Sequence, residues 1–221
     1  MLTHICSNVN LDLIQSAKNS IFVEEFRSTL NEPTGDFFYD EWTIKPEYKN
    51  SPWKELLDTL PFPKGEARII QLKPGTCYTS HSDIDDRYHL NISGTNSYLI
   101  DLDTQDMHKL ETDGNWYEMD AGKLHTAVNF GREVRNQLVV RKLLNRTKNK
   151  SVKVEIKTTT DNADLARYEF DNQISPVLNL LNKKCALDNF KHNSHSVSFD
   201  LDEGYIDTIK SVSNNLFKVI L

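Results

Sequence analysis

A histidine and an aspartate two positions apart stand out in the stretch "KPGTCYTSHSDIDDRYHL", which runs from Lys73 to Leu90. They are His81 and Asp83. Side chains two positions apart on a β-strand point to the same face, so this spacing would place an imidazole beside a carboxylate. Two histidines and one carboxylate are the protein ligands typical of a mononuclear non-haem Fe(II) site, with other positions open for substrate and dioxygen. The pair therefore predicts two of the three ligands of a metal centre.

The third ligand is expected from "DAGKLHTAVNF", where His125 follows an Ala-Gly turn and begins an alternating run. Ten positions later comes Arg135, on a strand-like run in which alternation places Arg135 and Arg141 on one face. An arginine that faces the inside of a barrel needs an anion, and its planar guanidinium fits a carboxylate through two hydrogen bonds. A dicarboxylate co-substrate would supply that anion, with Arg135 as the first choice and Arg141 as the second.

The elements that must position these residues are short strands. From Ala67 to about Leu144 the chain consists of strand-like runs such as "ARIIQL", "YHLNIS", "SYLIDL", "NWYEM" and "NQLVVRKLL", separated by turns that contain glycine. Many short strands at close spacing are typical of a barrel or jelly roll.

Helical patterns flank this segment. Before it, apolar residues recur about once per helical turn at Leu11, Ile14, Ala17, Ile21 and Phe22, and "SPWKELLDTL" begins with a Ser-Pro pair typical of a helix start. After a polar connection at about 145–151, "VKVEIK" predicts a strand, and "SPVLNLLNKK" and "EGYIDTIKSVSNNLFKVIL" predict helices. We therefore predict two units: residues 1–146 with the N-terminal helices and the β core, and residues 147–221 as a mainly helical unit.

Composition excludes several classes of protein. The 221 residues carry a net charge of −6, which argues against a nucleic-acid surface. No apolar run approaches the roughly 20 residues that span a bilayer, and the N-terminus lacks a signal-peptide pattern, so a cytoplasmic protein that does not bind membranes is expected. The three cysteines, Cys6, Cys77 and Cys185, are scattered. They predict neither a disulfide framework nor a zinc-thiolate site.

These motifs, in this order, resemble the aspartyl/asparaginyl β-hydroxylase-like family of Fe(II)/2-oxoglutarate-dependent oxygenases, which includes the bacterial cis-proline hydroxylases. The resemblance covers roughly Ala67 to Leu143. It comprises the Pro-Gly-Thr turn before the first histidine, the H-x-D pair, "RYHL", Trp116, and the last histidine with an arginine ten residues on. It implies an α+β fold with a double-stranded β-helix (cupin or jelly-roll-like) core, N-terminal helices and a small C-terminal helical appendage.

The resemblance also implies roles for individual residues. His81, Asp83 and His125 would hold Fe(II), and Arg135 would bind the distal carboxylate of 2-oxoglutarate. Two further residues, Arg87 and His89, would lie near the 1-carboxylate end of that co-substrate.

Two positions bear on the substrate. Some hydroxylases of peptidyl Asp and Asn have glycine where this chain has Asp83, whereas the cis-proline hydroxylases keep the carboxylate, which favours an amino-acid-like substrate. The peptidyl enzymes also use a serine to hold the co-substrate where this chain has Ile70. The expected activity is hydroxylation of a C–H bond with dioxygen and 2-oxoglutarate, releasing succinate and CO2. The alternatives are an aspartyl/asparaginyl β-hydroxylase acting on a peptide, a cupin-type metal-binding protein that does not use 2-oxoglutarate, and a non-catalytic β-barrel binding module.

The remaining polar residues near the motif have simpler interpretations. Asp85 and Asp86 are expected to stabilise a turn by bonding their own backbone. Trp116 is expected to pack in the core or at its rim. The other histidines, His4, His108, His192 and His195, are taken as structural or exposed.

Overall fold

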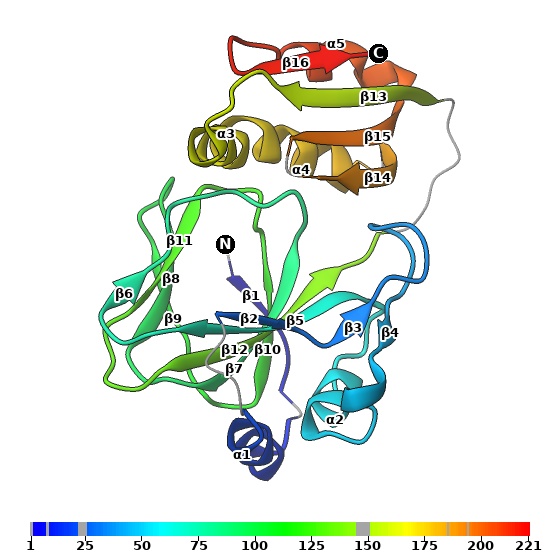
Figure 1. Cartoon of the computed structure of the whole chain (residues 1–221). Coiled ribbons are helices and arrows are strands. Elements are labelled where there is room, and N and C mark those ends of the chain that lie inside the picture. Colours follow the sequence, from blue (N-terminus) through cyan, green and yellow to red (C-terminus); the bar gives the residue numbers. More distant parts are fainter. Residues whose placement is uncertain (1, 8, 22–25, 145–150, 185, 194) are drawn as a thin grey trace.

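The computed structural model describes residues 2–7, 9–21, 26–144, 151–184, 186–193 and 195–221. Two units are visible in Figure 1: a β barrel with two helices at its lower end, and a smaller α/β unit above it. The predicted boundary between residues 146 and 147 lies outside the described residues. Among the described helices, none is long and apolar enough to cross a membrane.

Two antiparallel sheets form the barrel. In spatial order, the larger sheet contains β1 (Leu2–Ser7), β10 (Asn115–Met119), β7 (Arg87–Ser93), β12 (Arg135–Lys142), β5 (Lys64–Leu72) and β2 (Arg27–Thr29). The smaller sheet contains β6 (Thr76–Cys77), β11 (His125–Asn129), β8 (Ser97–Asp101) and β9 (Met107–Lys109). Apolar side chains of both sheets, including Leu72, Leu99, Met119 and Ala127, meet in a shared cluster. The arrangement is compatible with a jelly-roll or cupin-like core.

The two faces of the larger sheet differ in chemistry. On β12, Leu138 and Val140 point outward and pack with Trp53, Leu90 and Trp116 in the main apolar core. Helices α1 (Leu11–Asn19) and α2 (Pro52–Asp58) cover this outer face. Because side chains alternate along a strand, the residues between these apolar positions face the inside of the barrel. They include most of the polar residues singled out in the sequence, such as Arg135, Arg141, Arg87 and His89.

The first sixty residues contain strands as well as helices. Helix α1 begins after Asn10, whose side chain accepts a hydrogen bond from Asp12 N at 2.8 Å, and α2 begins after Ser51 with Pro52 in its first turn. Around them lie β1, β2, β3 (Asn31–Glu32), β4 (Thr43–Ile44) and the 3-10 turn η1 (Pro46–Tyr48). Phe22, the last apolar residue of the predicted helical pattern, lies outside the described residues.

The C-terminal unit corrects the prediction of a mainly helical segment. It contains a four-stranded sheet in the order β14 (Leu187–His192), β15 (Ser196–Asp202), β13 (Ser151–Thr158) and β16 (Phe217–Ile220). Its helical segments are α3 (Ala163–Glu169), the π-helical turn η2 (Phe170–Ile174), α4 (Ser175–Lys183), η3 (Glu203–Tyr205) and α5 (Ile206–Lys210). The sequence "SVSFDLD" alternates with period two, which fits a half-buried strand.

The predicted last helix ends early for a local reason. The side chain of Asn214 accepts hydrogen bonds from the backbone N–H groups of Leu216 and Phe217 at 2.7 and 2.9 Å. Such an Asx turn reverses the chain, because it offers the backbone an alternative to helical hydrogen bonds. The last residues then pair with β13 as strand β16.

Candidate metal centre

His81, Asp83 and His125 come together, with one ligand atom from each lying within 4.8 Å of those of the other two. His125 begins β11, whereas His81 lies in an isolated bridge to it. In this bridge each backbone N–H donates to the carbonyl oxygen of the other residue at 2.9 Å. Asp83 N donates to Ala121 O at 2.8 Å, which holds the loop in place. The backbone therefore positions all three side chains.

Both imidazoles are held in the same tautomer. The Nδ1 atom of His81 lies 2.8 Å from Thr79 O, and that of His125 lies 2.8 Å from Lys123 O. A carbonyl oxygen can only accept, so each Nδ1 must carry the proton and donate it. In the neutral form of such an imidazole Nε2 keeps its lone pair and can bind a metal ion.

The electrostatics of the centre also favour a cation. Burial lowers the pKa of His125 to about 4, and although the charge of Asp83 opposes this effect, the imidazole is neutral at pH 7. The Nε2 atom of His125 lies 3.8 Å from Asp83 Oδ2, while Asp83 Oδ1 accepts from Arg87 Nη2 at 2.9 Å. Two imidazoles and one carboxylate suit a divalent ion such as Fe(II), and the residues present fit this group.

Arg135 is buried, at 1% exposure, on the inside of the barrel. Its Nη2 donates to the hydroxyl of Tyr78 at 3.0 Å, but its Nε and Nη1 have no hydrogen-bond partner. Among the described residues no carboxylate pairs with it. Burial lowers the pKa of Arg135, which expresses the cost of keeping this charge away from water. Free donors on a buried guanidinium point to an anionic ligand, because an unsatisfied buried charge is costly.

His89 lies on β7 within electrostatic reach of Arg87, Arg135 and His125. Burial and the positive charges of Arg87 and Arg135 lower the pKa of His89 to about 3. The side chain of Gln137 on the adjacent strand faces the His89 ring and partly opposes this effect, but no hydrogen bond of normal geometry forms at either ring nitrogen or at Gln137 Nε2. The barrel interior near Arg135 is therefore polar and incompletely satisfied.

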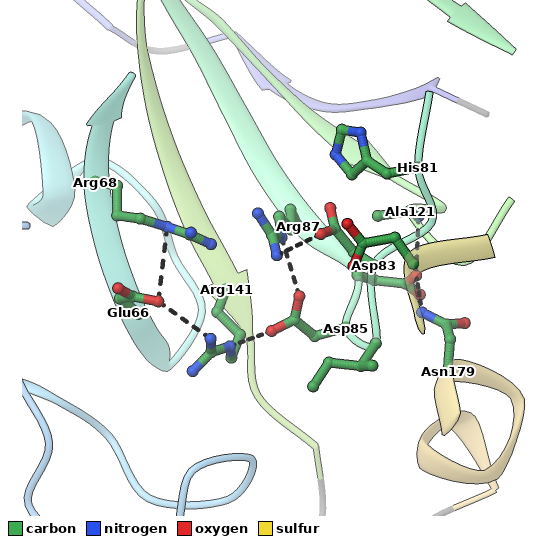
Figure 2. A network of polar contacts seen from close by, with 12 residues as sticks. Glu66, Arg68, His81, Asp83, Asp85, Arg87, Ala121, Arg141 and Asn179 are labelled. Atoms are coloured by element: carbon green, nitrogen blue, oxygen red, sulfur yellow. Dashed lines mark hydrogen bonds and ion pairs between the residues drawn. The ribbon is translucent and has the colours of Figure 1, made fainter. Parts of the chain in front are cut away.

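A network of ion pairs fills the other end of the same interior face, as Figure 2 shows. Arg87 donates to Asp85 at 2.9 Å as well as to Asp83, and Arg141 pairs with Asp85 and, at 3.1 Å, with Glu66. Although burial alone would raise it, Arg141 and Arg87 hold the pKa of Asp85 well below its usual value. The metal centre is thus tied to the centre of the barrel through Arg87.

The structure corrects the interpretation of Asp85 and Asp86 as turn residues. Asp85 is fully buried in the ion-pair network. Asp86 accepts from the backbone N–H of Ala121 at 3.2 Å and contacts Lys183 of α4 at 3.3 Å. A carboxylate in a loop can accept hydrogen bonds from its own backbone or pair with a distant cation. Here Asp85 and Asp86 pair with residues that are distant in the sequence.

Sequence reasoning missed Glu66 and Arg68. Both lie on β5 within the run "KGEARIIQL", and both are buried on the interior face. The signal was available, because strict alternation from Leu72 backward places Ile70, Arg68 and Glu66 on one side of the strand. Charged residues at these positions of a buried strand indicate a polar barrel interior, just as Arg135 does on β12.

The remaining predicted residues lie away from the centre. Trp116 is fully buried in the outer core, and its Nε1 donates to Thr59 Oγ1 at 2.9 Å. His192 and His195 are exposed. Cys6 and Cys77 are free thiols, and Cys185 lies outside the described residues.

The C-terminal unit holds the loop that carries His81 and Asp83. Ser82 N donates to Asp171 O at 3.1 Å, and Asn182 Nδ2 donates to Ile84 O at 3.1 Å. In Figure 1 the segment α3 to α4 lies between the C-terminal sheet and the barrel. The two units therefore share the walls of the site.

Comparisons with known proteins give weak likenesses only. No family model matches the sequence, and no curated protein matches it. One matching solved structure is CapF with the inhibitor 3-isopropenyl-tropolone, at 14% identity and a TM-score of 0.31, over 37% of this chain and 25% of that chain. Another is a 2OG complex of the viral collagen prolyl hydroxylase vCPH from Paramecium Bursaria Chlorella virus-1, at 10% identity and a TM-score of 0.40, over 63% of this chain and 94% of that chain.

This chain therefore spans about a quarter of the CapF chain it matches. Both TM-scores lie below 0.5, so neither likeness carries an argument about this chain. The resemblance to the aspartyl/asparaginyl β-hydroxylase-like family, and the cytoplasmic location, stay predictions.

Proposed function

We propose that this protein is an Fe(II)/2-oxoglutarate-dependent dioxygenase that hydroxylates a C–H bond of an amino-acid-like substrate. The observation that carries the proposal is the buried, unpaired guanidinium of Arg135 on the interior face that ends at His81, Asp83 and His125. A metal site alone fits many proteins. A metal site together with a buried cation that lacks a carboxylate fits an enzyme whose co-substrate is a dicarboxylate.

In this proposal His81, Asp83 and His125 hold Fe(II), and the bound iron supplies the activation of dioxygen. The reaction consumes the substrate C–H bond, dioxygen and 2-oxoglutarate, and it yields the alcohol, succinate and CO2. The protein binds the distal carboxylate through the guanidinium of Arg135. Tyr78, whose hydroxyl lies 3.0 Å from Arg135 Nη2, keeps that guanidinium oriented.

The pairing pattern favours Arg135 over Arg141 for this role. Arg141 is already neutralised by Asp85 and Glu66, so it has little to gain from a further carboxylate. A charge-assisted hydrogen bond is worth about 1.5–3 kcal/mol, and Arg135 has two donor atoms free to make such bonds.

His89 and Arg87 have different proposed parts. His89 is neutral, lies between the charges of Arg87 and Arg135, and has free ring nitrogens, which suits a contact near the 1-carboxylate end of 2-oxoglutarate. Arg87 is engaged by Asp83 and Asp85. Its proposed part is to position the Asp83 carboxylate.

The test is succinate formation from 2-oxoglutarate by protein loaded anaerobically with Fe(II) and then exposed to air. The assay is run with and without a panel of amino acids led by L-proline, with the His125→Ala variant as the blank. Succinate that rises with one amino acid would support the proposal and identify the substrate. Turnover that no amino acid stimulates would redirect the search to peptides, as in the aspartyl/asparaginyl β-hydroxylase alternative.

A cupin-type protein that does not use 2-oxoglutarate would give another result. Such a protein would bind Fe(II) through the same three residues, form no succinate, and bind 2-oxoglutarate no better than glutarate or succinate. That outcome would reject the proposed oxygenase activity but would still support the metal centre.

A further inference from the structure

A cavity of about 580 Å³ lies between the barrel and the C-terminal unit. Its barrel wall is charged and includes Arg68, Asp83 and Arg87. Its opposite wall is mixed: Ile156, Phe170 and Phe217 supply apolar surface, and polar residues such as Asp171 and His192 lie among them. Small-molecule sites commonly have volumes of about 300–1,000 Å³ and combine apolar walls with a few placed polar groups. Because Asp83 is one of the three candidate metal ligands, this cavity reaches the metal centre on that side.

Arg68 is the least satisfied charged residue of the barrel wall. It is 5% exposed, and its Nε and Nη2 atoms have no hydrogen-bond partner. The carboxylate paired with it belongs to Glu66, whose Oε2 lies 3.6 Å from Nε, too far for a hydrogen bond. Glu66 is already committed, since it accepts from Arg27 at 2.6 Å and from Arg141 at 3.1 Å.

On the barrel wall arginines outnumber carboxylates, whereas the opposite wall adds Arg167, Asp164 and Asp171 and makes the lining as a whole neutral. The guanidinium groups of Arg27, Arg68, Arg87 and Arg141 share the carboxylates of Glu66, Asp83 and Asp85. Figure 2 shows the side chains of Arg68, Arg87 and Arg141 converging on one region. Burial, and then the charge of Arg87, lower the pKa of Arg68 to about 9, so the group is still charged at pH 7. The case for an anion at Arg68 therefore rests on its unpartnered buried donors.

We infer that Arg68 binds the carboxylate of the substrate, and that the substrate is a small carboxylic acid with an apolar body. The carboxylate would take the free donors of Arg68, and the body would lie against Phe170 and Phe217 beside Asp83. This inference rests on the proposed function and adds the substrate class to it. It also separates two anion sites, with Arg68 for the substrate and Arg135 for the co-substrate.

The test is calorimetric titration of the full-length, metal-free chain with matched acid and amide pairs. The probes are L-leucine against L-leucinamide, 4-methylpentanoate against 4-methylpentanamide, and 3-phenylpropanoate against 3-phenylpropanamide. We expect at least one acid to bind about 10–100-fold more tightly than its amide. Equal binding within every pair, or binding of none of the acids, would overturn the inference.

Arg68→Met removes the proposed anchor while Glu66 keeps Arg27 and Arg141. It should weaken the acid about 10–100-fold and leave the amide unchanged. Arg68→Lys keeps the charge and tests the anchor if the methionine variant folds poorly, which thermal melts and circular dichroism report. The control is Arg132→Met, because Arg132 is exposed and does not line the cavity. This control should bind the acid as the wild type does.

Succinate formation and 2-oxoglutarate binding, measured on the wild type and on Arg68→Met, separate the inference from the proposed function. Acid binding that depends on Arg68 in a protein that forms no succinate would uphold the anchor and reject the oxygenase. Succinate formation with a substrate KM that Arg68→Met does not change would uphold the oxygenase and reject the anchor. A loss of 2-oxoglutarate affinity in Arg68→Met, with acid binding intact, would also reject the anchor.

Discussion

Two regions of the barrel interior, on one face of one sheet, treat buried charge in opposite ways. The paired region contains Glu66, Asp85, Arg87 and Arg141, in which every charge has a partner of opposite sign. The unpaired region contains His89, Arg135 and Gln137, where the described residues supply no carboxylate and several donors stay free.

The contrast teaches that burial alone does not assign a role to an arginine. Arg135 and Arg141 lie on the same strand, face the same way and are both buried, at 1% and 3% exposure. A buried ion pair is costly to break, because the remaining partner becomes an uncompensated charge. A buried charge without a partner is costly to keep, and its presence points to a ligand. The first pattern indicates structure, and the second indicates binding.

The largest expected effect comes from removing the metal centre that both regions adjoin. His125→Ala should abolish succinate formation and reduce the Fe(II) content measured after desalting, since one of three ligands is lost. The exposed His4, which does not line the cavity, provides a control, because His4→Ala should retain iron and turnover. Full turnover in His125→Ala would refute the assignment of the metal ligands.

Arg141→Met should break the paired region. Asp85 and Glu66 would lose a buried partner, and we expect the free energy of unfolding to fall by about 3–5 kcal/mol, measured by urea denaturation. Arg135→Met removes a charge that no carboxylate neutralises, so it should cost much less or increase stability. Equal losses in the two variants would show that the two regions do not differ as described.

The same pair of variants should give the reverse order for co-substrate binding. Arg135→Met should weaken 2-oxoglutarate binding by about 1.5–3 kcal/mol, roughly 10–150-fold, measured by calorimetry on protein loaded with Mn(II) as an inert substitute. Metal affinity itself should stay unchanged. If Arg141→Met loses the affinity and Arg135→Met keeps it, the distal carboxylate belongs to Arg141.

The smallest expected effect is a dependence of stability on pH that comes from His89. Its pKa is about 3 in the folded chain against an ordinary value of 6.5, so the unfolded chain binds more protons between these values. His89 therefore costs no stability above about pH 6.5, and its cost grows as the pH falls toward 3, by at most about 1.4 kcal/mol per pH unit. His89→Asn should show a shallower loss of unfolding free energy between pH 6 and pH 4. Parallel curves for variant and wild type would contradict this account.

The candidate site was largely predictable because its signals are local or strictly spaced. The H-x-D pair, the Ala-Gly turn before His125 and the alternation of β12 each depend on a few neighbouring residues. The ion pair of Asp85 with Arg141 was not predictable, because it joins residues 56 positions apart through the register of β7 and β12. Loop carboxylates look alike in sequence whether they bond their own backbone or a distant arginine.

The predictions of the fold likewise succeeded where the signals are local and failed where other parts of the chain decide the structure. The runs that became β5, β7, β8, β10 and β12 alternate clearly, and the structure places strands there. The strands β1 and β2 at the edges of the larger sheet were missed, since none of their described side chains is fully buried and their sequences carry little apolar pattern. The error at the C-terminus has another cause, because Ile206, Ile209 and Val212 do follow a helical period, yet the Asn214 turn ends it.

The backbone contacts of His81 and His125 in the candidate metal centre have a consequence for which substitutions this protein tolerates. Each Nδ1 donates to the main-chain oxygen of the residue two positions earlier, at Thr79 and Lys123, and uses no side chain for this purpose. Many metal sites fix the imidazole with a neighbouring carboxylate, and substitution of that carboxylate weakens the site. Here every amino acid at positions 79 and 123 carries the needed oxygen. These two positions are therefore free to vary in an engineered library, even though they lie next to the chemistry.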